Sequence, residues 1–175
     1  MKTSEVLTKW KEDIAHSEVG FRVKHLMINN VKGHFRKFDV HVETDNEDFK
    51  DAKISFSADV NSIDTGSEQR DQHLKSADFF EAEKYPELKF ESTRFEGDKL
   101  YGNLTMHGIT KPVTLDVEFG GVAKDPWGNK KAGFSISGNI NRKDFGLTWN
   151  AALETGGVLV SEEVKIYSEI QLVQA

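Results

Sequence analysis

The strongest constraint on this chain is a period-two alternation of apolar and polar residues that recurs along most of its length. In residues 18–25, Val19, Phe21, Val23 and His25 fall on one face of an extended segment, and residues 113–119 and 164–172 repeat the pattern. Alternation of this kind predicts half-buried β-strands. Strands with one apolar and one polar face are typical of antiparallel sheets that are solvated on one side.

About eight or nine such strands follow one another, mostly through short turns. The simplest closures for this arrangement are an up-and-down barrel and a sandwich. Five small residues interrupt the apolar faces: Ala52, Ala58, Gly102, Ala132 and Gly138. They favour an internal cavity over a packed centre, although the same residues can serve bends. At 175 residues, we expect one domain spanning residues 1–175.

The alternation changes phase once within the expected strand Val31–Glu43. Phe35 shares one parity with Val31, whereas Phe38 and Val40 share the other. A β-bulge near Arg36 and Lys37 would place both sets on the same side of the sheet.

One segment, Asp59–Pro86, breaks the strand rhythm. Thr65 and Glu68 have the spacing of a capping box, which predicts a helix from about Gly66 to Lys75. Phe79 and Phe80 follow in a second short turn. Their side chains either close one end of the core or meet a ligand.

Composition excludes several classes of site. The chain has no Cys, which removes disulfides and thiolate chemistry, and its net charge of −6 argues against a nucleic-acid partner.

No apolar run approaches the ~20 residues of a membrane helix, and the first residues lack the apolar core of a signal peptide. The expected location is cytoplasmic as written, or periplasmic if this is the mature form of an exported protein. The apolar residues 26–28 suit a homodimer contact.

Short motifs along the chain resemble the YceI-like family, lipocalin-like barrels regarded as polyisoprenoid-binding. The matching pieces, in order, are Trp10, Asp13, His16-Ser17-x-Val19-x-Phe21-x-Val23-x-His25-Leu26, Val31-x-Gly33-x-Phe35, Ile63-x-Thr65, Arg70-Asp71-x-His73-Leu74-x-Ser76-x-Asp78-Phe79-Phe80, Tyr85-Pro86, Phe90-x-Ser92, Gly102-x-Leu104-Thr105-x-x-Gly108, Pro112-Val113-x-Leu115 and Arg142-x-Asp144-Phe145-Gly146. Each piece is short, and the ordered set covers nearly the whole chain.

The resemblance implies an all-β fold, an eight-stranded antiparallel barrel with a short helical insert and a lipophilic pore. It implies a lipophilic ligand, a polyisoprenoid or a quinone-like molecule, that is bound, stored or transported without chemistry. The expected pore lining is the inward set Phe21, Val23, Phe35, Phe56, Leu104, Met106, Phe134 and Ile136, with Trp149, Phe79 and Phe80 at the mouth.

A polar head group would need partners near that mouth, and Arg70, His73 and His25 are the available donors. Arg70 has the geometry to pair with a phosphate. Alternatively, Arg70 and Asp71 hold the insert in place by local hydrogen bonds, and His25 is a core histidine.

Two alternative interpretations of the function remain open. A lipocalin-like enzyme that isomerises a bound lipid would need one titratable residue inside the pore, and His25 is the candidate. A barrel with a filled core would bind nothing. The six His are dispersed and no nucleotide-binding motif occurs, so neither a metal nor a cofactor is expected.

Overall fold

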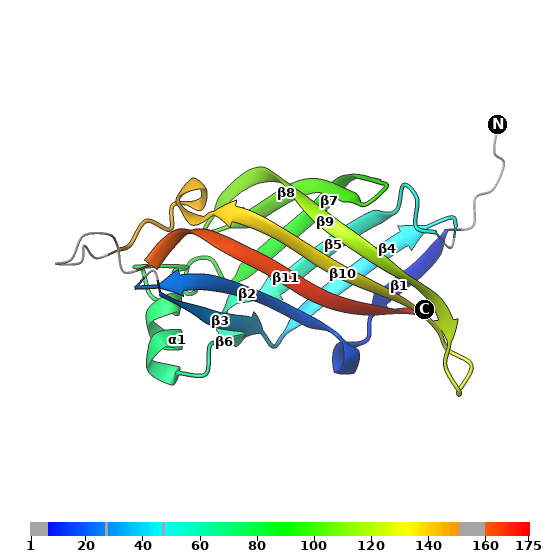
Figure 1. Cartoon of the computed structure of the whole chain (residues 1–175), viewed down its shortest axis with the longest axis horizontal. Coiled ribbons are helices and arrows are strands. Elements are labelled where there is room, and N and C mark those ends of the chain that lie inside the picture. The colour runs from blue at the N-terminus through cyan, green and yellow to red at the C-terminus, as the bar shows by residue number, and fades with distance from the viewer. Residues whose placement is uncertain (1–6, 27, 47, 151–159) are drawn as a thin grey trace.

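The computed structural model describes residues 7–26, 28–46, 48–150 and 160–175, and its strands form a closed antiparallel barrel (Figure 1). The strands are β1 (Thr8–Glu12), β2 (Glu18–His25), β3 (Asn29–Phe35), β4 (Phe38–Thr44), β5 (Lys53–Asp59), β6 (Ile63–Asp64), β7 (Glu87–Glu96), β8 (Lys99–Met106), β9 (Ile109–Lys124), β10 (Lys130–Asn141) and β11 (Val160–Gln174). The helix is α1 (Glu68–Lys75), and three 3₁₀ turns are η1 (Ile14–His16), η2 (Val60–Ser62) and η3 (Arg142–Phe145). The predicted all-β fold with a short helical insert is confirmed.

The ring closes between the first and the last strand. Its order is β1-β4-β5-β7-β8-β9-β10-β11, and β11 pairs back to β1 with Trp10 opposite Gln174. The segments β2, β3 and β6 extend this wall, because β2 pairs with β11 beyond β1, β3 with β2 and β6 with β3. The predicted eight-stranded barrel is therefore confirmed, with its first three strands each divided into two segments.

The phase change near Arg36 is one of these divisions. Instead of a bulge in one strand, the structure has two strands, β3 and β4, separated by Arg36 and Lys37. The amide of Arg36 donates to the Ser62 carbonyl at 3.1 Å and the amide of Lys37 to the Ser62 hydroxyl at 3.0 Å, so both residues leave the ladder. Phe35 and Phe38 are both buried, as predicted.

The helix of the insert begins at Glu68, and its N-cap is Ser67 rather than Thr65. The Ser67 hydroxyl accepts from the amide of Arg70 at 3.3 Å. Thr65 cannot cap the helix because its hydroxyl donates to Asp71 at 2.5 Å and accepts from the Arg70 Nε at 2.8 Å. The predicted capping box was wrong, and the predicted end at Lys75 was right.

One end of the barrel is closed by aromatic rings. Phe49, between β4 and β5, has a φ of +61° and is 1% exposed. Its ring lies 5.1 Å from Trp10, 5.0 Å from Phe134 and 5.5 Å from Phe119. These rings form the floor of the barrel, at the end opposite α1.

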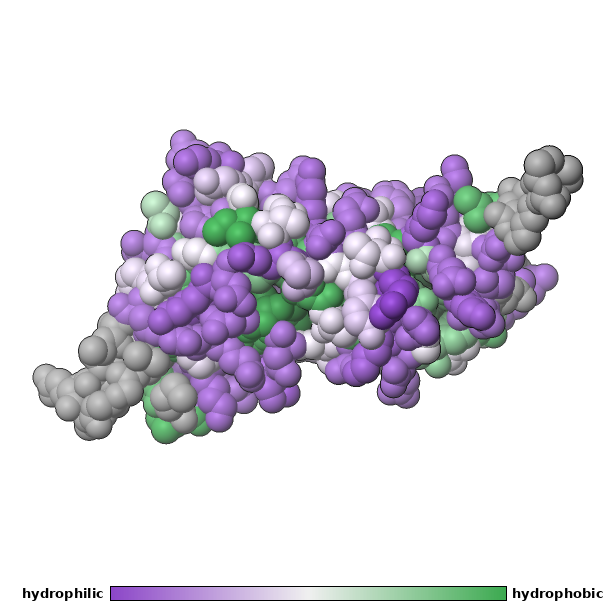
Figure 2. Space-filling model, turned by 90° about the horizontal axis from the view of Figure 1, so that it is seen from above, coloured by the Kyte–Doolittle hydropathy of each residue, from purple (hydrophilic) through white to green (hydrophobic). Residues whose placement is uncertain are grey.

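The outer surface is mainly polar, as the alternation requires. Figure 2 shows polar side chains over most of one face, with small apolar groups between them. Among the described residues, no helix is long and apolar enough to cross a bilayer.

Candidate functional site

The inside of the barrel holds a cavity of about 360 Å³. A single water needs only ~10–15 Å³ measured in this way, so the space is far larger than a packing defect. Its wall draws on nearly every strand, on α1 and on the segment after η3, and most of the lining side chains are aliphatic or aromatic. The alternative of a barrel with a filled core is therefore not what the structure shows.

All fourteen residues predicted for the site line this cavity. They are Phe21, Val23, His25, Phe35, Phe56, Arg70, His73, Phe79, Phe80, Leu104, Met106, Phe134, Ile136 and Trp149. For the nine on strands this location follows from strand parity, because every inward position of a closed barrel meets the same interior. Arg70, His73, Phe79, Phe80 and Trp149 belong to the insert and to the segment after η3. That they contact a ligand stays a prediction.

Two of the five small residues, Gly102 and Gly138, do not leave open space at their own positions, contrary to the expectation. A Cβ on Gly102 would lie 2.4 Å from the Phe90 ring, and one on Gly138 would lie 2.6 Å from a Leu115 methyl group. Larger neighbours thus fill these positions, while Phe90 and Leu115 themselves line the cavity.

The mouth of the cavity is at the α1 end, which in Figure 1 also holds the β2–β3 turn and the start of β11. The exposed lining residues Lys24 and Arg70 lie here. We define the mouth by Lys24, His25, Arg70, His73 and Trp149. Of the patch predicted for a homodimer, Leu26 is 39% and Ile28 75% exposed at this end, and Met27 lies outside the described residues.

Three rings pack together at the mouth. The His73 ring lies 4.8 Å from Trp149 and 5.1 Å from Phe79, and Trp149 and Phe79 are 5.3 Å apart. His73 Nε2 is also 3.0 Å from the Asp78 carboxylate. The insert is thereby joined to the segment that follows η3.

Arg70 and Asp71 hold the base of the insert by local hydrogen bonds, which is the alternative that the sequence left open. The buried Asp71 carboxylate accepts from the amide of Thr65 at 2.9 Å and from its hydroxyl. Arg70 donates to the Thr65 carbonyl at 2.6 Å and to the Thr65 hydroxyl. Arg70 is therefore engaged with the protein itself.

Arg142 is the lining residue whose environment the sequence did not reveal. Only 3% of it is exposed, and its guanidinium donates to four backbone carbonyls, those of Leu147, Trp149, Val160 and Ser161, at 2.7–3.3 Å. Burial lowers the pKa of Arg142 from its usual value, and the charge of Glu162 opposes this shift. The motif around Arg142 is visible in the sequence, but the sequence does not indicate which four backbone carbonyls accept its hydrogen bonds.

The cavity wall carries basic groups and no acidic one among the described residues. Lys24, Arg70 and Arg142 line it, all at the α1 end. The whole chain has more acidic than basic residues, 29 against 23. The mouth is thus positively charged although the whole chain is negatively charged, and this favours an uncharged or anionic ligand.

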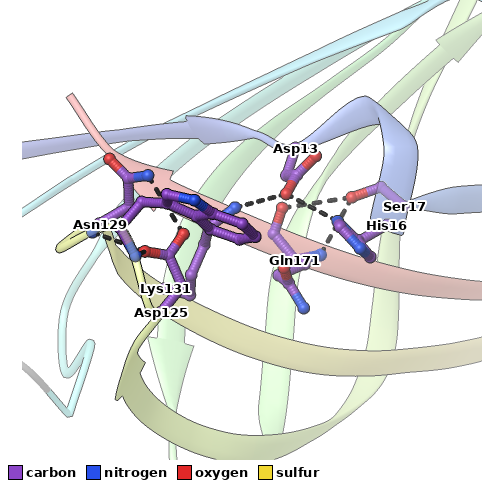
Figure 3. Close-up of polar contacts among 8 residues, drawn as sticks. Asp13, His16, Ser17, Asp125, Asn129, Lys131 and Gln171 are labelled. Carbon is purple, nitrogen blue, oxygen red and sulfur yellow. Dashed lines mark hydrogen bonds and ion pairs between the residues drawn. The ribbon is translucent and has the colours of Figure 1, made fainter.

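A cluster on the outside of the barrel contains Ser, His and Asp but does not form a nucleophilic relay (Figure 3). His16 Nδ1 lies 2.8 Å from Asp13, whereas the Ser17 hydroxyl donates to the carbonyl of Gln171 at 3.2 Å. A relay would need a hydrogen bond between Ser17 and His16. Asp13 instead pairs with Lys131 at 2.5 Å, so the cluster ties η1 to β10.

No group of three or more His, Asp or Glu side chains suited to hold a metal occurs in the described part of the chain.

Comparison with known proteins identifies the family. A model of the YceI-like domain matches residues 10–172. The UPF0312 protein SA2479 of Staphylococcus aureus (strain N315) is 44% identical over 160 residues, which cover 91% of this chain and 94% of the relative.

Solved structures agree with the fold. A YCEI protein of Campylobacter jejuni superposes with a TM-score of 0.74 at 33% identity, covering 100% of this chain and 99% of that one. A polyisoprenoid binding domain from Saccharophagus degradans has a TM-score of 0.68 at 14% identity, covering 95% and 98%, and at that identity it speaks for the fold alone. Together with the barrel and its apolar cavity, the domain match shows that this chain belongs to the YceI-like family.

Proposed function

We propose that this protein binds one long lipophilic molecule of the polyisoprenoid type inside its barrel and stores or transports it without changing it. The observation that carries the proposal is the apolar cavity enclosed by the strands. A barrel of the same fold in Saccharophagus degradans is a polyisoprenoid binding domain, so the fold itself accommodates a ligand of this class.

The physical basis of such binding is hydrophobic. Each CH₂ group removed from water contributes ~0.8 kcal/mol, so a long chain gains affinity from length without polar recognition. The lining between mouth and floor consists almost wholly of aliphatic and aromatic side chains. A narrow apolar channel of this kind selects for shape and length more than for functional groups.

The head group of the ligand is a phosphate or a neutral quinone-like ring. The absence of carboxylates from the described lining disfavours a cationic head. Because Arg70 is bonded to Thr65 and His73 to Asp78, we expect Lys24 and His25 to be the more available groups at the mouth.

A chain that isomerises its ligand would need a titratable group against the buried part of the lipid. His25 and His73 both lie at the mouth, so neither is placed along the apolar channel. Non-catalytic binding fits this placement better.

The experiment is native mass spectrometry of the purified protein, followed by solvent extraction and identification of what is released. We expect the protein to carry a lipid of one defined mass, and we expect the extracted lipid to be chemically unmodified. Ile136→Trp, which fills the cavity, should abolish its retention. The matched control is Ser137→Trp, because Ser137 is the exposed neighbour on the same strand. Equal retention by both variants would contradict binding inside the barrel.

A further inference from the structure

Ser168 stands apart from every other polar residue of the cavity wall. The remaining polar lining residues, Lys24, His25, Thr65, Arg70, His73 and Arg142, all lie at the α1 end. Ser168 is on β11, directly opposite Val19 of β2 and Ile136 of β10. Ile166 and Ile170, its neighbours on the same face of the strand, also line the cavity. The residues paired with Ser168 and its neighbours on the same face of β11 are therefore all aliphatic.

The Ser168 hydroxyl also has no hydrogen-bond partner in the part of the chain that the structure describes. Ser168 is 9% exposed and is one of four buried polar residues. The other three, Thr44, Asp71 and Arg142, are all hydrogen-bonded. Among the described residues, the fully enclosed side-chain polar atom without a hydrogen-bond partner is Trp10 Nε1 and not the Ser168 oxygen. The Ser168 hydroxyl therefore faces the cavity, where a ligand oxygen can accept the hydrogen bond that the protein leaves unmade.

The position of Ser168 says which part of a guest would reach it. Val19, its partner on β2, is six residues from His25 at the mouth, which is about 20 Å along the strand at ~3.3 Å per residue. An anionic head would stay near Lys24, because burying an isolated charge so deeply is strongly unfavourable. A neutral oxygen can be buried there if it is hydrogen-bonded.

We infer that Ser168 is a specificity-determining residue that hydrogen-bonds a neutral oxygen on the buried part of the ligand. The ligand class that fits is a lipophile with a carbonyl or hydroxyl on the end that enters first, such as a quinone-type ring carrying an alkyl or isoprenoid tail. This inference rests on the proposed function, since it requires that a lipid occupy the cavity, and it narrows the choice of head group.

The test compares two probes with the same tail and a six-membered ring, of which only the first carries ring carbonyl oxygens: 2-decyl-1,4-benzoquinone and decylbenzene. Their dissociation constants are measured for the wild type and for Ser168→Ala, with the exposed Ser137→Ala as control. We expect Ser168→Ala to weaken quinone binding about 3- to 10-fold, as for the loss of one hydrogen bond. Decylbenzene binding should change less than about 2-fold, and the melting temperature of the free protein should stay equal or rise.

Several results would overturn the inference. Ser168→Ala could weaken both probes by the same factor or leave quinone binding unchanged, and the wild type could bind decylbenzene but not the quinone. If the wild type binds neither probe, the proposed function itself fails. If Ser168→Ala does not fold, Ser168→Cys, which keeps the size but donates weakly, must show the same selective loss for the inference to stand.

Discussion

At the scale of single residues, Arg142 stands out among the buried polar residues that the structure describes. It is a buried cation that four carbonyl oxygens satisfy, and no carboxylate among the described residues pairs with it. Two of the acceptors precede residues 151–159 and two follow them, so one side chain joins both sides of this segment. Only a planar group with five N–H donors can serve four acceptors at once.

Arg142→Lys should therefore destabilise the protein although it keeps the charge. An ammonium has three donors and cannot reach all four carbonyls, so we expect a loss of about 3–5 kcal/mol in the free energy of unfolding, measured in urea. The control is Lys143→Met, which removes an exposed ion pair with Glu162 and should cost under about 1 kcal/mol. A loss of similar size in both variants would contradict a special stabilising role for the four hydrogen bonds of Arg142.

Asp13 gives a pH dependence of stability. Its pKa is lowered below the usual value, first by the hydrogen bond from Lys131 and then by that from His16. A carboxylate with a lowered pKa in the folded state stabilises the protein above its unfolded pKa of ~3.9, and this stability is lost as the pH falls through the folded pKa.

Asp13→Asn should thus unfold more easily than the wild type at pH 7, by about 1–2 kcal/mol, because the lost ion pair with Lys131 is partly exposed to solvent. The difference should be constant above about pH 5 and shrink below pH 4. The measurement is urea unfolding of both proteins from pH 2 to 7. A difference that persists unchanged at pH 2 would show that another effect of the substitution dominates.

At the scale of elements, the insert is attached to the barrel at two places of different chemistry. Hydrogen bonds among Thr65, Arg70 and Asp71 hold its base. On its far side, the rings of His73 and Phe79 pack on Trp149. In the described part of the chain, β6 pairs with β3 alone, and α1 of the insert follows this short strand.

Asp71→Ala should loosen the insert while the barrel stays intact. Thr65 loses two hydrogen bonds, and we expect amide hydrogen exchange in α1 to become at least about 10-fold faster, which corresponds to ~1.4 kcal/mol of local stability. Exchange in β10 should stay unchanged. The exposed Glu68→Ala serves as control, and equally faster exchange throughout the barrel would contradict a local role.

Residue alternation predicted most of this architecture, because each inward position in a closed antiparallel barrel follows from parity. It therefore placed Phe21, Phe56 and Ile136 correctly. It missed Phe49, which lies in a polar turn and reaches the floor only through its left-handed backbone. It also assigned the helix cap to Thr65, because side-chain bonds to Asp71 six residues away leave no trace in a four-residue motif.

At the scale of the whole molecule, the barrel is a ring with a floor of aromatic rings at one end and a basic mouth at the other. A ligand that binds only this closed form stabilises it by mass action, by about 2.7 kcal/mol at a concentration of 100 Kd. For a chain of this size that corresponds to a rise in melting temperature of about 5–10 °C.

We therefore expect geranylgeraniol, an isoprenoid alcohol, to raise the melting temperature of lipid-free protein in a concentration-dependent way. Calorimetry would measure the shift, and the cavity-filling variant Ile136→Trp should show little of it. An equal shift in that variant would place the binding elsewhere on the molecule.

The pairing of Trp10 with Gln174 has a kinetic consequence as well. The strands that seal the ring are separated by nearly the whole chain, and contacts between such distant residues form late because the intervening loop must first be ordered. The hairpins from β7 to β11 can assemble locally, but the interior is enclosed only after this last pairing. We therefore expect a newly made chain to form an open, curved sheet before the ring closes, and a lipid present at that moment to be enclosed without passing through the mouth.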